Sequence, residues 1–243
     1  EATQKLLDAS IRAGVRRFVL ASTSGTIAVS ADDPRPKTER DEPSLAVVGR
    51  WPYYMSKRLE ERTVLARHEK KEIEAVILNP SLLLGPGDDR LSSTRDVLDI
   101  LNRRIPAVPD GTVAFVDVRD CAPAFVAALE RGSPGARYLL NGANMSVRRF
   151  FERIALSGNV AAPRLRLPNR VALSGARFLE GLMHAIDRVP EIQAAAVDMA
   201  CHHWACDASL AKAELGFVAR DPQLTIRDTV AHLEGMGAFR RPT

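Results

Sequence analysis

The sequence contains 243 residues, of which 46% are hydrophobic and 26% are charged, and its formal net charge is +4. This composition is typical of a globular protein, and no apolar run reaches the ~20 residues that a membrane-spanning helix needs, so we expect no membrane partner. Three cysteines are too few for a disulfide framework and favour a reducing, cytoplasmic setting. The scattered positive charge suits an anionic ligand such as a nucleotide but does not indicate nucleic acid binding.

Helical and strand patterns alternate over the first third of the chain. Apolar residues at helical spacing predict a helix that ends at Gly14, and the apolar run 18–21 then predicts a buried parallel strand. A turn-rich loop over 30–50 precedes a predicted helix over 53–69, and 74–78 predicts a second buried strand. The order helix, strand, helix, strand is typical of a parallel sheet with crossover helices.

The alternation stops after Gly87, since 82–87 predicts a Gly/Pro turn that leaves the sheet, and it resumes briefly at Val113. The rest of the chain predicts strands over 113–116 and 138–140 and helices over 96–102, 119–131, 146–154, 208–215 and 226–233. We therefore predict an α/β fold, a partial Rossmann-type doubly wound parallel sheet with a small, mainly helical substrate lobe. We assign to the sheet domain residues 1–87, 113–131 and 218–243, and to the lobe residues 88–112 and 132–217.

Tyr53 and Lys57 stand four residues apart at the start of a predicted helix, so their side chains share one of its faces. A lysine cation held near a phenol stabilises the phenolate. Because free tyrosine has a pKa of about 10, lowering it by two or three units gives a general acid/base near neutral pH. The same spacing also occurs in helices whose tyrosine packs inward and whose lysine is solvated. The flanking sequence must therefore distinguish a catalytic pair from this structural arrangement.

A hydroxyl-rich segment, Ser22-Thr23-Ser24-Gly25-Thr26, directly follows the first predicted strand. In open α/β sheets, ligands bind beyond the carboxyl ends of the strands. A hydroxyl at this position can donate to a substrate oxygen. Alternatively, these side chains satisfy the backbone of their own turn.

Five segments in order carry one common pattern. They are RFVLASTSGT at 17–26, PYYMSK at 52–57, LNPSLLLGPGD at 78–88, FVDVRD at 115–120 and WACDASLAKAELGF at 204–217. Together they resemble the extended short-chain dehydrogenases/reductases, which form the NAD-dependent epimerase/dehydratase superfamily. The resemblance is strongest to the dihydroflavonol-reductase-like branch and covers most of the chain.

The resemblance implies roles for individual residues. Tyr53 is the acid/base, while Lys57 stabilises its phenolate and holds the ribose of the nicotinamide. The hydroxyl partner is Thr23 by alignment on Gly25, with Ser24 as the alternative. The cofactor is NAD(P), which supplies the redox chemistry. The residues expected to contact the cofactor are Tyr53, Lys57, Ala21, Pro80, Ser81 and Leu83.

The chain departs from the family pattern in one respect, because it contains no glycine-rich phosphate turn of the G-x-G-x-x-G type. At roughly 30 residues per βαβ unit, we expect N-terminal truncation by on the order of 80–100 residues. A fragment, a shortened gene prediction or a separate chain that completes the fold would each account for it. In the family, the residue that selects between NAD and NADP lies in that N-terminal portion, so this sequence does not distinguish the two cofactors.

Two functions from different classes follow. The first is an oxidoreductase or sugar epimerase/reductase that acts on a carbonyl or hydroxyl group of a small molecule or sugar, as a possible homodimer. The alternative is a non-catalytic scaffold or binding protein that lacks the dinucleotide-binding glycine turn.

Two further groups of polar residues invite a metal-site interpretation. Cys201 to Cys206 hold four possible ligands, but zinc sites usually draw spaced pairs from two segments, so we predict no metal. The family resemblance implies that this segment is a helix-to-strand junction. Asp117 and Asp120 follow a predicted strand, and we expect them to cap the next helix rather than to act as a carboxylate pair.

Overall fold

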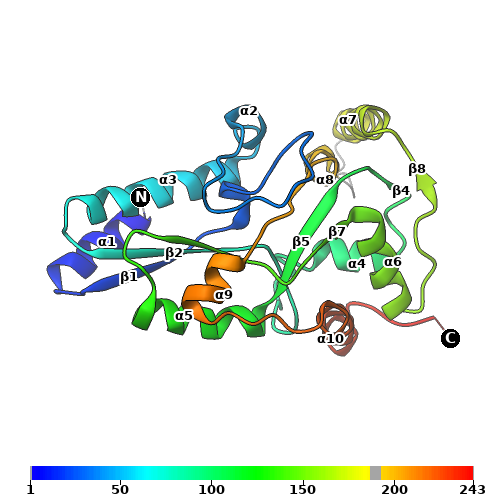
Figure 1. Ribbon diagram of the computed structural model, residues 1–243. Helices are drawn as coiled ribbons and strands as arrows, with labels where there is room; N and C mark the ends of the chain where they lie inside the picture. The colour runs from blue at the N-terminus through cyan, green and yellow to red at the C-terminus, as the bar shows by residue number, and fades with distance from the viewer. Residues whose placement is uncertain (1, 187–192, 243) are drawn as a thin grey trace.

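A three-stranded parallel sheet organises one half of the molecule (Figure 1). This computed structural model describes residues 2–186 and 193–242. The strands lie in the order β1 (Arg17–Ala21), β2 (Glu74–Pro80) and β6 (Arg137–Leu140). Both ladders are parallel, with Val19 opposite Val76 in the first of them. The parallel pairing of the first two predicted strands is therefore confirmed.

Helices cover both faces of this sheet, as Figure 1 shows. They are α1 (Ala2–Arg12) and α3 (Pro52–Glu69) on one face, and α5 (Val118–Arg131) and α9 (Ser209–Leu215) on the other. Alternate residues of β2 face opposite sides: Ile77 packs with α1 and α3, whereas Leu78 packs with α5 and α9. A central strand buried on both faces explains why its sequence is almost continuously apolar. The predicted doubly wound α/β architecture is confirmed.

A second sheet continues from the first and corrects the turn predicted over 82–87. Its strands lie in the order β3 (Leu82–Leu84), β5 (Thr112–Asp117) and β7 (Ala143–Ser146). Leu83 is opposite Val116 in a parallel ladder, so the chain leaves β2 as another strand rather than as a turn. The turn comes later, at Gly85 and Gly87, whose φ angles of +113° and +102° favour glycine.

Three helices build the core of the second half. They are α4 (Arg95–Leu101), α6 (Val147–Ser157) and α10 (Pro222–Gly235), with buried side chains that include Leu101, Phe150 and Leu233. The small strands β4 (Ala107–Val108) and β8 (Leu165–Arg166) and the helices α7 (Asn169–Ala185) and α8 (Ala194–Ala200) complete this half.

The division into a sheet domain and a substrate lobe remains a prediction. Strand pairing places β6, at 137–140, beside β2, and α9 packs on the same sheet, so these elements associate with the sheet domain. By contrast, α10 shares a core with α4 and α6. These packing relations favour moving β6 and α9 to the sheet domain and α10 to the lobe. A local sequence pattern does not reveal which element a strand or helix packs against.

The segment between β1 and α3 holds the short helices η1 (Ser24–Thr26) and α2 (Leu45–Val48) and crosses the free edge of β6. There, the backbone N–H of Leu139 donates to Glu39 Oε1 at 2.8 Å. A side chain thus occupies a backbone donor at a strand edge, which limits edge-to-edge pairing. Within the two described ranges, no helix has the length and hydropathy needed to cross a bilayer.

Candidate active site

The predicted pair Tyr53 and Lys57 lies in the first turns of α3, beside the carboxyl end of β1. Pro52 occupies the first helical turn, where a missing N–H costs nothing. Lys57 Nζ donates to the carbonyl oxygen of Ala21 at 3.2 Å and to Glu60 Oε2 at 3.1 Å. The Tyr53 side chain is 55% exposed. The helix therefore presents a phenol and an anchored cation at the sheet edge where ligands of parallel sheets bind.

Tyr54 has a different environment from its neighbour. Its ring lies 5.2 Å from that of Trp204 and 5.8 Å from that of Trp51. It also covers Gly25, where a Cβ atom would lie 2.2 Å from Tyr54 Cε1. Burial raises the pKa of Tyr54 well above its usual range. Tyr54 is thus a packing residue that stays protonated near neutral pH.

The hydroxyl-rich segment forms the short helix η1 at the end of β1. Thr23 is its N-cap, with extended backbone angles, and Thr23 Oγ1 accepts from the Gly25 N–H at 3.3 Å. Thr23 is partly exposed, whereas Ser24 is only 5% exposed. The turn therefore satisfies some of its own backbone, as one interpretation predicted. Among the described residues, the Thr23 hydroxyl donates no hydrogen bond, so its role towards a substrate stays a prediction.

A buried carboxylate behind this turn was absent from the sequence prediction. Glu61, 4% exposed, lies eight residues after Tyr53 on the same face of α3. Its Oε1 accepts from the Ser22 hydroxyl, lies 2.7 Å from Thr26 Oγ1 and accepts from Asn79 Nδ2 at 2.7 Å. A charge in a low-dielectric interior needs such partners. In the sequence, only the position of Glu61 one helical turn after Lys57 could have indicated that it belongs to the site.

The predicted cofactor contacts after β2 lie at the same sheet edge. Pro80 ends β2 opposite Leu140, and Ser81 Oγ lies 3.2 Å from the Leu140 carbonyl oxygen and 3.0 Å from Asn141 Oδ1. The Ser81 hydroxyl is therefore committed to the protein. Leu83 packs against the core under α5. The assignment of these residues to a cofactor stays a prediction.

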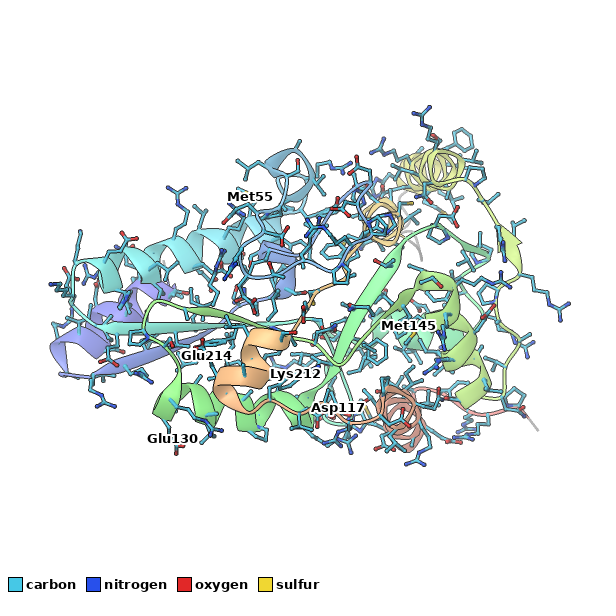
Figure 2. The ribbon with its side chains drawn as sticks, in the orientation of Figure 1. Met55, Asp117, Glu130, Met145, Lys212 and Glu214 are labelled. Atoms are coloured by element: carbon cyan, nitrogen blue, oxygen red, sulfur yellow. The ribbon has the colours of Figure 1, made fainter. Side chains whose placement is uncertain are left out.

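Asp117 caps α5 as predicted, since its Oδ1 accepts from the Arg119 N–H at 2.9 Å. Figure 2 shows it where β5 meets α5. Burial opposes its ionisation, but hydrogen bonds from Arg119 outweigh that effect and hold the pKa of Asp117 below its usual range. Asp120 does not cap the helix as predicted. Its carboxylate instead accepts hydrogen bonds from the backbone N–H and the guanidinium of Arg220, both at 2.8 Å.

The segment from Cys201 to Cys206 follows α8. His202 Nδ1 lies 2.6 Å from the Asp198 carbonyl oxygen, and its Nε2 lies 2.9 Å from the guanidinium of Arg50. Burial raises the pKa of Cys201 to about 11 and that of Cys206 to about 12, so both stay thiols at neutral pH. Among the described residues, no three His, Cys, Asp or Glu side chains are placed to hold a metal ion.

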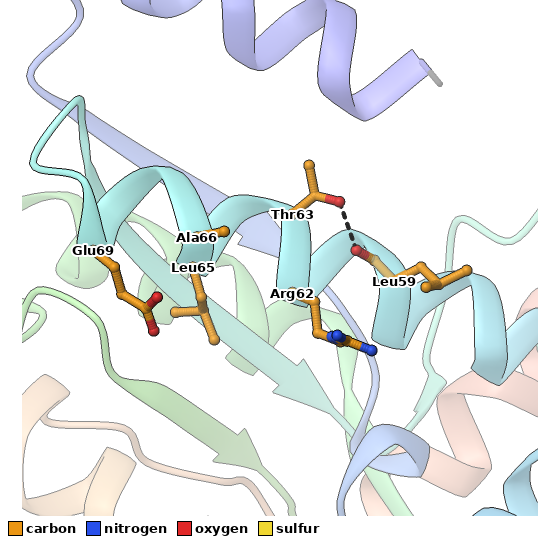
Figure 3. A pocket seen from close by; sticks show the side chains of 6 residues that line it. All are labelled: Leu59, Arg62, Thr63, Leu65, Ala66 and Glu69. Atoms are coloured by element: carbon orange, nitrogen blue, oxygen red, sulfur yellow. Dashed lines mark hydrogen bonds between the residues drawn. The ribbon is translucent and has the colours of Figure 1, made fainter.

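A groove of about 580 Å³ follows the outer side of α3, away from these groups. Its lining residues all belong to α3: Leu59, Arg62, Thr63, Leu65, Ala66 and Glu69. Figure 3 shows the Thr63 hydroxyl bonded to the Leu59 carbonyl oxygen, at 2.8 Å, while Arg62 and Glu69 extend to another side of the helix. Because the polar groups do not converge, we place the candidate site at the N-terminal end of α3 instead.

Comparison with known proteins identifies relatives that span most of this chain. A "Putative dihydroflavonol 4-reductase" of Synechocystis sp. is 29% identical over 234 residues, which cover 94% of this chain and 66% of the relative. "Sterol demethylase protein B" of Methylococcus capsulatus is 26% identical over 241 residues, covering 97% of this chain and 71% of that protein. The chain thus spans slightly less than two thirds of the length of the Synechocystis relative.

Solved structures give the same fold. The crystal structure of gox2253 is 27% identical, with a TM-score of 0.81, and the match covers 98% of this chain and 72% of that one. The fold is also that of PA4631, described as a nucleoside-diphosphate-sugar epimerase from Pseudomonas aeruginosa, with 22% identity, a TM-score of 0.78, and coverage of 96% and 71%. Residues 1–140 match the family described as "NAD dependent epimerase/dehydratase family". The resemblance carried by the five motifs is confirmed, and the chain belongs to the NAD-dependent epimerase/dehydratase family.

Proposed function

We propose that this protein is an NAD(P)-dependent oxidoreductase or epimerase that acts on a carbonyl or hydroxyl group, with Tyr53 as the acid/base. The observation that carries the proposal is the placement of Lys57. Its ammonium is tied to the Ala21 carbonyl oxygen at 3.2 Å, on the same helix face as the exposed Tyr53. A fixed cation beside a phenol, at a sheet edge, is the arrangement that proton transfer to a substrate oxygen needs.

Each group has a stated task in this proposal. Tyr53 delivers a proton to the reacting oxygen, or removes it, and Lys57 stabilises the phenolate that forms. Lys57 Nζ has three hydrogens, of which Ala21 and Glu60 occupy two, so one donor remains for a ribose hydroxyl of the cofactor. Bound NAD(P) supplies the hydride transfer. Pro80, Ser81 and Leu83 then border the nicotinamide through backbone and apolar atoms.

The hydroxyl partner is assigned to Thr23 rather than Ser24. Thr23 is partly exposed, and its Oγ1 accepts one hydrogen bond while keeping its own hydrogen. Ser24 is buried. Thr23→Val is therefore expected to reduce kcat more than Ser24→Ala, although less than loss of the acid/base itself, because it removes one hydrogen bond to the substrate oxygen.

The substrate class that we favour is a small-molecule carbonyl compound. Several relatives carry the names of reductases, among them "Cinnamoyl-CoA reductase 1" of Arabidopsis thaliana, 30% identical over 142 residues. That match covers 56% of this chain and 41% of the relative, so it supports a reductase without defining its substrate. A sugar remains the second substrate class, in keeping with the epimerases of the family.

Titration of the chain with NADH and NADPH, followed by nicotinamide fluorescence, tests the proposal at its first step. Oxidation of the bound cofactor is then measured with a panel of aldehydes, ketones and acyl-CoA thioesters, and with nucleotide sugars for epimerisation. We expect saturable binding of one cofactor, and turnover that Tyr53→Phe abolishes, once the glycine-rich phosphate turn that these 243 residues lack is supplied in the same or a second chain. Absence of both binding and turnover when that turn is supplied would instead favour the non-catalytic scaffold.

A further inference from the structure

A single buried carboxylate holds the hydroxyl-rich turn at both of its ends. Ser22 precedes Thr23 and donates to Glu61 Oε1, while Thr26, at the other end of η1, places its Oγ1 at 2.7 Å from the same oxygen. Glu61 belongs to α3, the helix that carries Tyr53 and Lys57. One side chain thus connects the helix of the acid/base pair to both flanks of the proposed hydroxyl partner.

Asn79 extends this connection into the central strand. Its Nδ2 lies 2.7 Å from Glu61 Oε1, 3.0 Å from Thr26 Oγ1 and 3.1 Å from the Thr23 carbonyl oxygen. Two amide hydrogens serve these three acceptors, and the single Thr26 hydrogen serves either Glu61 or the Thr23 carbonyl oxygen at 2.8 Å. The backbone of Thr23 is therefore bound to groups that Glu61 itself orients.

The cluster is almost completely shielded from solvent. Asn79 and Thr26 are fully buried, and Ser22 is 9% exposed. Arg137 on β6 places its Nη1 3.9 Å from Glu61 Oε2. Hydrogen bonds in such surroundings are strong and directional, and losing one partner leaves the others unsatisfied. The turn consequently has little freedom to move relative to α3.

We infer that Glu61 is a positioning residue of the active site, which sets the placement of the Thr23 hydroxyl relative to Tyr53 and Lys57. The inference rests on the proposed function. Glu61 lies behind the turn and does not contact substrate. Its effect reaches the reacting oxygen through Ser22 and Thr26. A misplacement of about 1 Å can cost on the order of 100-fold in rate, which is the effect expected when this carboxylate is lost.

Four proteins test the inference: wild type, Glu61→Gln, Thr26→Val and the control Glu214→Gln. Glu214 accepts from the Tyr138 hydroxyl and from Ser133 Oγ at 2.9 Å, so the control removes the same kind of carboxylate–hydroxyl contact. Figure 2 shows Glu214 on α9, across the sheet from Met55 on α3. For each protein, urea unfolding, the Kd for NADPH, kcat, KM and amide hydrogen exchange are measured.

For Glu61→Gln we expect kcat to fall about 100-fold, with the Kd for NADPH unchanged within about threefold. Amides of residues 22–28 should exchange faster while those of β2 and β6 keep their protection. Thr26→Val keeps the shape of the threonine side chain and leaves the Glu61 carboxylate in place, and its kcat should fall about tenfold. The control should keep wild-type kcat, because its carboxylate–hydroxyl contacts lie on the face of the sheet opposite α3. Urea unfolding shows whether each variant is fully folded under the assay conditions, so that a smaller folded fraction is not read as a lower kcat.

The inference is overturned by a Glu61→Gln variant with kcat within threefold of wild type, or by equal kcat losses in Glu61→Gln and the control. Unchanged exchange at residues 22–28 also overturns it. If Glu61→Gln does not fold, Thr26→Val decides by the same criteria. If the wild-type protein shows no turnover even when the glycine-rich phosphate turn is supplied, the proposed function fails, and the exchange comparison alone then decides whether Glu61 orders the turn.

Discussion

Tyr53→Phe is expected to remove nearly all turnover while leaving the fold intact. The substitution deletes one hydroxyl from a side chain that is 55% exposed and that has no hydrogen bond through this group among the described residues. The free energy of unfolding should therefore change by less than about 0.5 kcal/mol. General acid/base groups contribute ~100–10,000-fold, so kcat should fall by at least about 100-fold, equivalent to about 2.7 kcal/mol of lost transition-state stabilisation.

Tyr54→Phe is the matched control, because it deletes the same atom from the adjacent residue. The Tyr54 ring keeps its contacts with Trp51 and Trp204, and burial already holds its hydroxyl in the protonated form near neutral pH. We expect kcat within about threefold of wild type, since no transition-state interaction is lost. Steady-state kinetics and urea unfolding of both variants supply the comparison. An inactive Tyr54→Phe beside an active Tyr53→Phe would refute the assignment of the acid/base.

Three further perturbations follow from the structure. Lys57→Met keeps the aliphatic length but removes the cation, so kcat for alcohol oxidation should fall and its pH dependence should move to higher pH, because the phenolate then forms less readily; a pH–rate profile measures this shift. Gly25→Ala places a Cβ 2.2 Å from Tyr54 Cε1 and should cost about 1–3 kcal/mol in urea unfolding, whereas the control Gly175→Ala, with no atom within 4 Å, should not destabilise. Asp41→Asn should cost about 1–2 kcal/mol at pH 7, because a hydrogen bond from the Thr38 N–H is the largest cause that lowers the pKa of Asp41 to about 2. That contribution is complete above the unfolded pKa of about 3.9 and is lost as the pH falls towards 2, so the difference from wild type should be roughly halved at pH 3; equal differences at both pH values would contradict the assignment.

A helix with a marked start was predictable from the sequence. The helix predicted over 53–69 is α3, Pro52–Glu69, and the proline in its first turn marks where it begins. The turn predicted over 82–87 is confirmed at 85–87 but was wrong for 82–84, which form β3, because three successive leucines show no alternation to indicate a strand. The partner of 137–140 was equally hidden, since the pairing of β6 with β2 joins residues about 60 positions apart.

The candidate site shows the same limit at the level of single side chains. The relation between Tyr53 and Lys57 lies within one helical turn, so a short segment of sequence contains it completely. Glu61 belongs to the same helix, yet a glutamate near the middle of a helix with many charges is expected to face water. Its burial depends on donors from two other segments, Ser22 and Thr26 at the end of β1 and Asn79 on β2. Nothing in the residues next to Glu61 specifies those donors, and only the parallel packing of β1 and β2 beneath α3 brings them to its carboxylate.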